Sequence, residues 1–193
     1  MLARNSIVWM AGLVLGLTIS ASKAENFDPE GRFTNGFYRQ TYSPGYSSIA
    51  RSAVSAPGSY GPNTIVISTS QRRLYYVAGN GQAISYGIGV GRVGFTWSGV
   101  TRVSAKREWP SWTPPAQMRR RQPGLPGHMG GGLNNPLGAR ALYLGSSLYR
   151  IHGSNEPHTI GQAVSSGCFR MTNDDVIDLY NRVRVGTKVI VTH

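Results

Sequence analysis

Two side chains in the last third of the chain could carry out nucleophilic chemistry together. Cys168 is the single cysteine among the 193 residues, and His152 lies 16 residues before it. A thiol becomes a nucleophile when a nearby imidazole accepts its proton, and the imidazole can then protonate a leaving group. Spacing alone does not show that the two side chains meet, and a lone cysteine is also common as a small core residue. Cys168 is therefore a candidate nucleophile, with His152 as its candidate proton partner.

The residue before the cysteine favours a tight turn at this point. Gly167 precedes Cys168 and allows a backbone conformation that a side chain would obstruct. The backbone N–H of Cys168 could then help to stabilise an oxyanion. A single cysteine also excludes an internal disulfide framework, a cysteine-based zinc site and an iron–sulfur centre.

A metal site built on the histidines is not expected. His152 and His158 are six residues apart with Glu156 between them, and Pro157 interrupts the segment. This is not the ligand spacing that a helix provides. We predict neither a metal nor another cofactor.

The elements that must position Cys168 and His152 are mostly strands. β-branched and apolar runs bounded by turn residues predict strands at 64–69, 73–78, 83–90, 100–106, 141–144, 148–151 and 187–192. The first four are interpreted as a β-meander, with a hairpin turn at residues 79–81. One helix is predicted at 173–183, because Thr172 and Asp175 resemble a capping box and the apolar residues that follow share one face.

Residues 107–138 form a long segment without a clear periodic pattern. It holds six of the eleven prolines, two tryptophans and the run Arg119-Arg120-Arg121. Loops of this length inside a domain are usually functional or disordered. The segment is either a lid that closes over a substrate or a loop on the surface whose arginines are exposed to solvent.

The N-terminal region predicts export. Residues 1–24 have a basic start, an uncharged run at 6–19 and small residues before a cleavage point after Ala24, which is the layout of a signal peptide. Residues 25–62 are rich in Gly, Pro and Ser and predict a flexible linker that also carries aromatic residues. We expect no stable membrane span in the mature protein and a location in the periplasm or cell-wall space. The formal charge of +12 suits an anionic envelope polymer, whereas nucleic acid is a poor candidate there.

Three short motifs together resemble one enzyme family. Residues 152–155 read His-Gly-Ser-Asn, residues 165–171 read Ser-Ser-Gly-Cys-Phe-Arg-Met, and residues 173–175 read Asn-Asp-Asp. This combination resembles the L,D-transpeptidase catalytic domain (the YkuD-like family that includes ErfK, YbiS and YcfS). The resemblance covers residues 63–193. Ser166 stands where many members have His or another large residue, and Phe169 replaces a β-branched residue.

The resemblance implies a fold and a set of roles. The fold would be mainly β, a sandwich or barrel with one C-terminal α-helix. Cys168 would be the nucleophile and His152 the proton donor and acceptor, with a backbone carbonyl of Gly153 or Ser154 orienting the imidazole. Arg170 would organise the cysteine loop or hold a substrate carboxylate. The other residues expected to support the loop are Ser165, Gly167 and Asn155.

The resemblance also implies an activity. The protein would be an exported cysteine L,D-transpeptidase that acts on peptidoglycan stem tetrapeptides, releases D-alanine through a thioester at Cys168 and transfers the acyl group to an amine. That amine would belong to another stem or to an envelope protein. The alternatives are an L,D-carboxypeptidase, in which water resolves the thioester, and a non-catalytic wall-binding module with an inert, buried Cys168. A monomer is expected.

Overall fold

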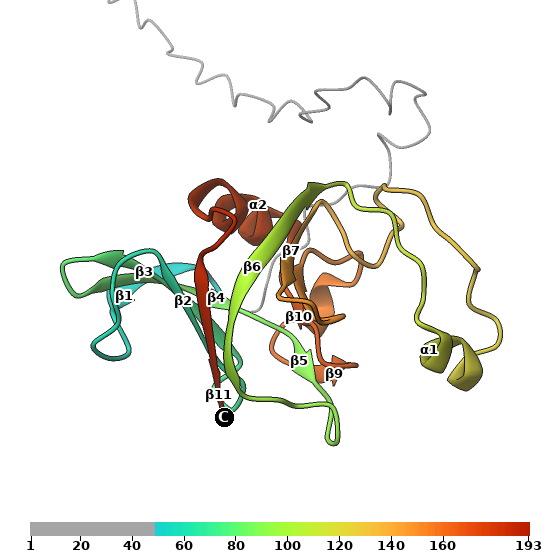
Figure 1. Cartoon of the computed structure of the whole chain (residues 1–193), viewed down its shortest axis with the longest axis horizontal. Helices are drawn as coiled ribbons and strands as arrows, with labels where there is room; N and C mark the ends of the chain where they lie inside the picture. The colour runs from blue at the N-terminus through green and yellow to red at the C-terminus, as the bar shows by residue number, and fades with distance from the viewer. Residues whose placement is uncertain (1–48) are drawn as a thin grey trace, which may run out of the picture. The chain divides into compact units, whose positions relative to one another are not determined.

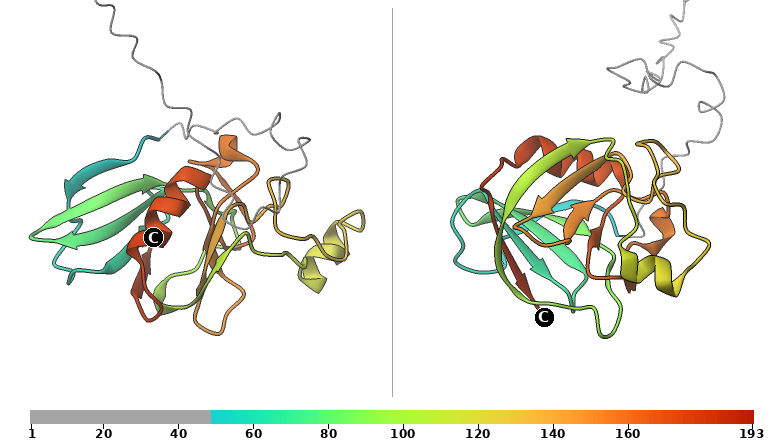
Figure 2. Two further views of the ribbon diagram at one scale, coloured as in Figure 1. Left: turned by 90° about the horizontal axis from the view of Figure 1, so that it is seen from above. Right: turned by 45° about the vertical axis from the view of Figure 1, so that its right-hand side comes forward.

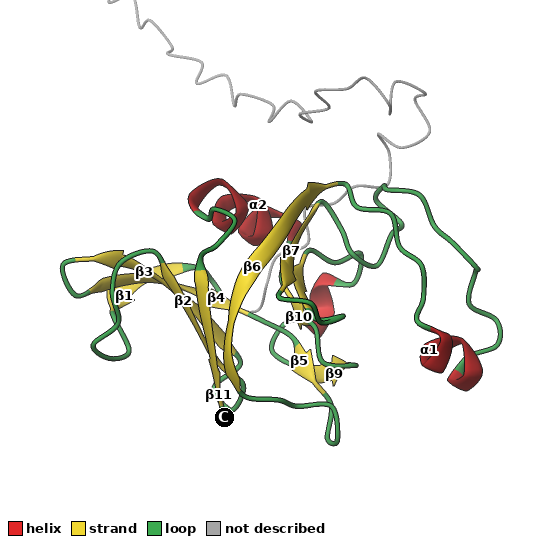
Figure 3. Cartoon of the chain, viewed as in Figure 1, coloured by secondary structure: helices red, strands yellow, loops and turns green. Residues whose placement is uncertain are grey.

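The computed structural model describes residues 49–193, and strands predominate in it (Figure 3). The expected signal peptide (1–24) and residues 25–48 of the expected linker lie outside the described residues. The strands are β1 (Ser52–Ser55), β2 (Thr64–Ser68), β3 (Arg73–Gly79), β4 (Gln82–Gly87), β5 (Val90–Gly91), β6 (Gly99–Glu108), β7 (Arg140–Leu144), β8 (Arg150–His152), β9 (Ala163–Ser165), β10 (Phe169–Arg170) and β11 (Lys188–Thr192). The helices are α1 (Ala116–Arg121), the 3₁₀ turn η1 (Pro157–Thr159) and α2 (Asn173–Arg182). The prediction of a mainly β chain is confirmed.

Nine of these strands join in one sheet (Figure 1). Their order is β1-β4-β3-β2-β11-β6-β7-β8-β10, and β5 pairs separately with β9. Neighbours in the large sheet are antiparallel except for two parallel pairs, β2 with β11 and β8 with β10. The last strand of the chain therefore lies in the middle of the sheet.

The N-terminal strands agree with the predicted meander only in part. β2, β3 and β4 are antiparallel neighbours, and the turn between β3 and β4 has positive φ at Gly79, Asn80 and Gly81. The fourth predicted strand is present as β6, but it pairs with β11 and β7 rather than with β4. The predicted meander is wrong at this step because β1 occupies the place beside β4, and β11, which buries Val189 and Val191, joins β6 to the opposite side of the three strands.

A strand also forms inside the expected linker. β1 is antiparallel to β4, with Ser52 opposite Ser85 and Ser55 opposite Gln82. Backbone hydrogen bonds to an available sheet edge do not require apolar side chains, so a serine-rich segment can become an edge strand. Arg51, just before β1, also forms a 3.2 Å ion pair with Asp178 of α2.

The 107–138 segment contains a second helix that the expectation of one helix missed. β6 extends to Glu108, and α1 then follows Pro115. None of the α1 residues is buried, and the helix projects from the sheet at the end of a long loop (Figures 1 and 2). No helix between residues 49 and 193 is long and apolar enough to cross a membrane.

The predicted C-terminal helix is confirmed as α2. The Thr172 hydroxyl accepts a hydrogen bond from the backbone N–H of Asp175 at 3.2 Å, which caps the first turn. Val176 and Leu179 are fully buried, and α2 packs against β7 and β8. The helix thus covers the part of the sheet that carries His152.

Candidate active site

The parallel pair β8–β10 brings the two predicted reactive residues to the same place. His152 is the last residue of β8, and it lies opposite Arg170 in the register. Cys168 comes immediately before β10. A parallel pair needs a crossover connection of a dozen or more residues, and residues 153–168 provide it.

Cys168 and His152 both line a cleft of about 940 Å³. Its walls come from separate parts of the chain: Phe95 lies before β6, Arg121 on α1, and Tyr149 before β8. The proline-rich segment therefore contributes to the wall of the cleft, while its closure over a substrate stays a prediction. The volume is of the size that binds small molecules and short peptides.

His152 is held by its neighbour in the chain. Its Nδ1 lies 2.6 Å from the carbonyl oxygen of Gly153, and the side chain is buried. Burial lowers the pKa of His152 to about 3; the hydrogen bond to Gly153 opposes this shift, and the charges of Arg170 and Arg150 add to it. A carbonyl oxygen only accepts hydrogen bonds, so Nδ1 carries the proton of the neutral ring and Nε2 is left as the base.

The thiol of Cys168 is also neutral in the resting protein. It donates a 3.7 Å hydrogen bond to the carbonyl oxygen of Leu148. Burial raises the pKa of the thiol, and hydrogen bonding and charge from Arg150 together with the charge of Arg170 act against this shift. The resting site therefore pairs a protonated thiol with a neutral imidazole, and the proton has to move when the sulfur attacks.

The turn before Cys168 is tied by hydrogen bonds. Ser165 Oγ donates to the carbonyl oxygen of Cys168 at 2.6 Å and accepts from the N–H of Gly167 at 3.1 Å. Gly167 has φ of +107°, and a Cβ at this position would collide with the Tyr149 ring. Trp97 Nε1 donates to the Gly167 carbonyl at 3.0 Å. The backbone around the thiol thus has one defined shape that only glycine accommodates.

An aromatic cluster supports this turn, and sequence reasoning missed it. Trp97 stacks on Tyr149 with ring centroids 4.8 Å apart and lies 5.6 Å from the ring of Phe169. Phe169 follows Cys168 directly and is buried in the hydrophobic core, so its ring anchors the end of the nucleophile turn. Neither Trp97 nor Tyr149 belongs to a motif, and no sequence pattern connects them across more than fifty positions.

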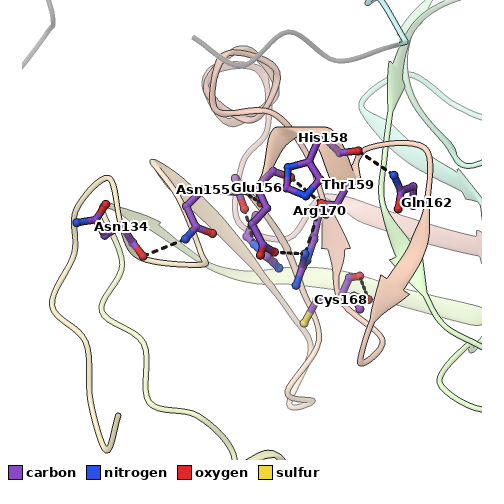
Figure 4. A network of polar contacts seen from close by, with 12 residues as sticks. Asn134, Asn155, Glu156, His158, Thr159, Gln162, Cys168 and Arg170 are labelled. Carbon is purple, nitrogen blue, oxygen red and sulfur yellow. Dashed lines mark hydrogen bonds and ion pairs between the residues drawn. The ribbon is translucent and has the colours of Figure 1, made fainter. Parts of the chain in front are cut away.

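A polar network lies near Cys168 (Figure 4). Arg170 Nη1 pairs with Glu156 Oε2 at 2.8 Å and lies 3.4 Å from Thr159 Oγ1. Asn155 Nδ2 donates to the carbonyl oxygen of Asn134 at 3.1 Å, which connects the 107–138 segment to the loop after His152. Glu156 is thus the partner of Arg170, and the imidazole is oriented by a carbonyl instead.

The histidines do not form a metal centre with Glu156. Within residues 49–193, no three His, Cys, Asp or Glu side chains are placed to hold an ion together. His158 is exposed, while His152 is buried against Gly153.

Comparisons with known proteins point to one family. Residues 62–191 match the model of the L,D-transpeptidase catalytic domain (YkuD) family. The probable L,D-transpeptidase YcfS of Escherichia coli is 42% identical over 135 residues, which is 65% of this chain and 42% of that protein. The chain thus spans less than half the length of this curated relative.

Solved structures show the same fold. An L,D-transpeptidase from Mycobacterium smegmatis is similar with a TM-score of 0.52 at 20% identity, over 67% of this chain and 58% of that one. A crystal structure from Brucella melitensis is 45% identical with a TM-score of 0.52, over 76% of this chain and 96% of that one. That protein bears the name probable carnitine operon oxidoreductase, which differs from the family matched by residues 62–191.

Proposed function

The chain belongs to the L,D-transpeptidase catalytic domain family, and on this premise we propose that it is an exported cysteine transpeptidase acting on peptidoglycan stem tetrapeptides. The observation that carries the proposal is the shared cleft, in which the Cys168 thiol lies with a neutral imidazole whose Nδ1 is bound to Gly153. This arrangement supplies a nucleophile and a base without an acidic third residue. Export to the periplasm or cell-wall space is part of the proposal.

The first half of the reaction forms a thioester. Nε2 of His152 takes the thiol proton as the sulfur attacks the carbonyl carbon of the diamino acid at its L-centre. The bond from this carbon to the D-alanine nitrogen then breaks. His152 returns the proton to that nitrogen, so D-alanine leaves as a neutral amine and the acyl group stays on Cys168.

The second half transfers the acyl group. An amine of another stem, or of an envelope protein, attacks the thioester and loses a proton to His152. The carbon–sulfur bond breaks, and the thiol of Cys168 is restored with that proton. If water attacks instead, the product is a tripeptide stem and the enzyme is an L,D-carboxypeptidase.

The test is mass spectrometry of the protein incubated with purified tetrapeptide muropeptides. We expect cross-linked dimers that have lost one D-alanine, and none with Cys168→Ala. Ser166→Ala is the matched control, because it changes the neighbouring residue without removing the thiol. Circular dichroism of each variant shows that the fold is retained.

Each outcome assigns the chain to one function. Tripeptides without dimers would replace the transpeptidase by the carboxypeptidase. If neither product forms, and iodoacetamide does not modify folded Cys168, a non-catalytic wall-binding module takes the place of both. Full activity of Cys168→Ala would remove the nucleophile assignment.

A further inference from the structure

A positive charge beside Cys168 would stabilise its thiolate form. In many cysteine enzymes a protonated imidazole supplies that charge. Here His152 is buried and neutral, so it accepts the proton but does not stabilise a thiolate beforehand. The charged and titratable groups around the sulfur are His152 and Arg150 on β8, Arg170 on β10 and, beyond Arg170, Glu156.

Arg150 and the thiol of Cys168 share one hydrogen-bond acceptor, the carbonyl oxygen of Leu148. Arg150 Nη1 donates to Leu148 O at 3.2 Å, and the Cys168 sulfur donates to this oxygen at 3.7 Å. Arg150 and His152 are two apart on β8, so both point to the same face of the strand. The guanidinium carbon lies 5.1 Å from the centre of the Tyr143 ring, the cross-strand partner of Arg150, and this contact holds it at the cleft.

The two arginines near the sulfur differ in their partners. Arg170 forms a 2.8 Å ion pair with Glu156, which offsets part of its charge. Arg150 has no such acidic partner among the ion pairs of residues 49–193, and its Nε is buried without a hydrogen-bond partner. A buried, unused donor on a charged group costs free energy unless another state of the site uses it. Ionisation of Cys168 creates such a state, because a thiolate can no longer donate to Leu148 O.

We propose that Arg150 is a positioning residue that provides the counter-charge and a hydrogen-bond donor for the Cys168 thiolate, in place of a protonated histidine. In the free protein the thiol releases its proton to solvent and with it loses the hydrogen bond to Leu148 O, and the guanidinium next to the sulfur then stabilises the negative charge while His152 stays neutral. The benefit to catalysis rests on the proposed function, whereas the effect on the thiol itself does not.

The experiment follows the rate of Cys168 alkylation by iodoacetamide against pH, measured by intact mass on the full chain. An opposite charge at close range lowers a pKa by about 1–3 units. Arg150→Gln should therefore raise the midpoint of the profile by at least about one unit. Because a more basic thiolate is also more nucleophilic, the rate near neutral pH should fall only about threefold per unit. Arg150→Lys should raise the midpoint by less than half as much.

A matched variant and a second measurement complete the test. Arg121→Gln removes a charge from the same cleft but not from beside the sulfur, and its midpoint should stay that of the parent. An equal shift in Arg121→Gln, or none in Arg150→Gln, overturns the proposal. If Arg150→Gln does not fold, the same alkylation profile is measured on His152→Asn. A midpoint equal to that of the parent supports Arg150 as the counter-charge, whereas a rise of about one unit shows that the imidazole is the counter-charge and overturns the proposal.

The test also separates the two proposals. Alkylation needs no peptidoglycan, so a shifted midpoint without muropeptide turnover would leave Arg150 in its role and remove the transpeptidase. Turnover of muropeptides by the parent, together with an unchanged midpoint in Arg150→Gln, would keep the transpeptidase and remove the proposed role of Arg150.

Discussion

Acid should destabilise the folded protein through His152, and His152→Asn should remove this sensitivity. The pKa of His152 is about 3 in the folded chain, against an ordinary value of about 6.5 when the chain is unfolded. Between these values the unfolded chain binds a proton that the folded chain excludes. The free energy of unfolding therefore falls as the pH falls from about 6.5, by up to about 1.4 kcal/mol per pH unit, and levels off near pH 3.

The size of the effect is measurable well above pH 3. Between about pH 6.5 and pH 4.5 this single group should remove about 2–3 kcal/mol. Asn is the chosen replacement because its amide nitrogen can take the place of Nδ1 and donate to Gly153 O, while it does not titrate. Other groups that respond to pH are common to both proteins, so the difference between their profiles isolates His152.

The assay is urea unfolding followed by tryptophan fluorescence at several pH values from about 7 to about 4.5. The parent should lose about 2–3 kcal/mol more than His152→Asn over this range. His158→Asn is the control, because His158 is exposed and its replacement should leave the pH dependence of the parent intact. Parallel profiles for the parent and His152→Asn would refute a neutral, buried imidazole, and with it the assignment of Nε2 as the resting base.

Three further substitutions test the packing around the site. Gly167→Ala should lower the free energy of unfolding by about 2–4 kcal/mol in urea titrations, because φ is +107° and the added methyl meets the Tyr149 ring; a loss below about 0.5 kcal/mol would contradict the positive φ. Trp97→Phe should cost about 1 kcal/mol through the lost bond to Gly167 O, and should lower kcat on muropeptides more than it raises KM; an effect on KM alone would argue against a role in shaping the turn. Tyr86→Phe should cost about 1.5–3 kcal/mol by thermal or urea unfolding, since the Tyr86 hydroxyl donates to the Asp178 carboxylate at 2.6 Å in a buried setting; a stability equal to that of the parent would show that water replaces this bond.

Local sequence patterns were sufficient to predict most of the strands and α2. The run at 64–69 is β-branched and becomes β2, fully buried at Ile65 and Ile67. The hairpin turn at 79–81 also follows from residues that tolerate positive φ. In each of these cases the preference lies within a few neighbouring residues, so the sequence expresses it directly.

The pairing of distant strands could not be predicted in this way. β11 lies between β2 and β6 although 119 residues separate it from the end of β2 and 79 from the end of β6. β1 has no alternating apolar pattern, and it is a strand because β4 offers it an edge. The contact of Trp97 with Tyr149 depends on the same arrangement, since both reach the cysteine turn from loops that the sheet brings together.

The spacing between His152 and Cys168 has its explanation in this topology. Residues a similar distance apart can pair across a hairpin, as Arg73 and Gly87 do at 14 positions. His152 and Cys168 are connected in a different way. They line the same cleft because β8 and β10 are parallel, and the connection between parallel strands must return to the end of the sheet at which the first strand began. The crossover contains η1 and β9, and β9 pairs with β5, so the connection is itself held in the structure. The same parallel register places Arg170 opposite His152 and leaves Arg150 on the face of β8 that meets the thiol. A shorter crossover would bring the chain back out of register, so we expect deletion of one residue from 160–163 to abolish thiol reactivity even where the chain still folds.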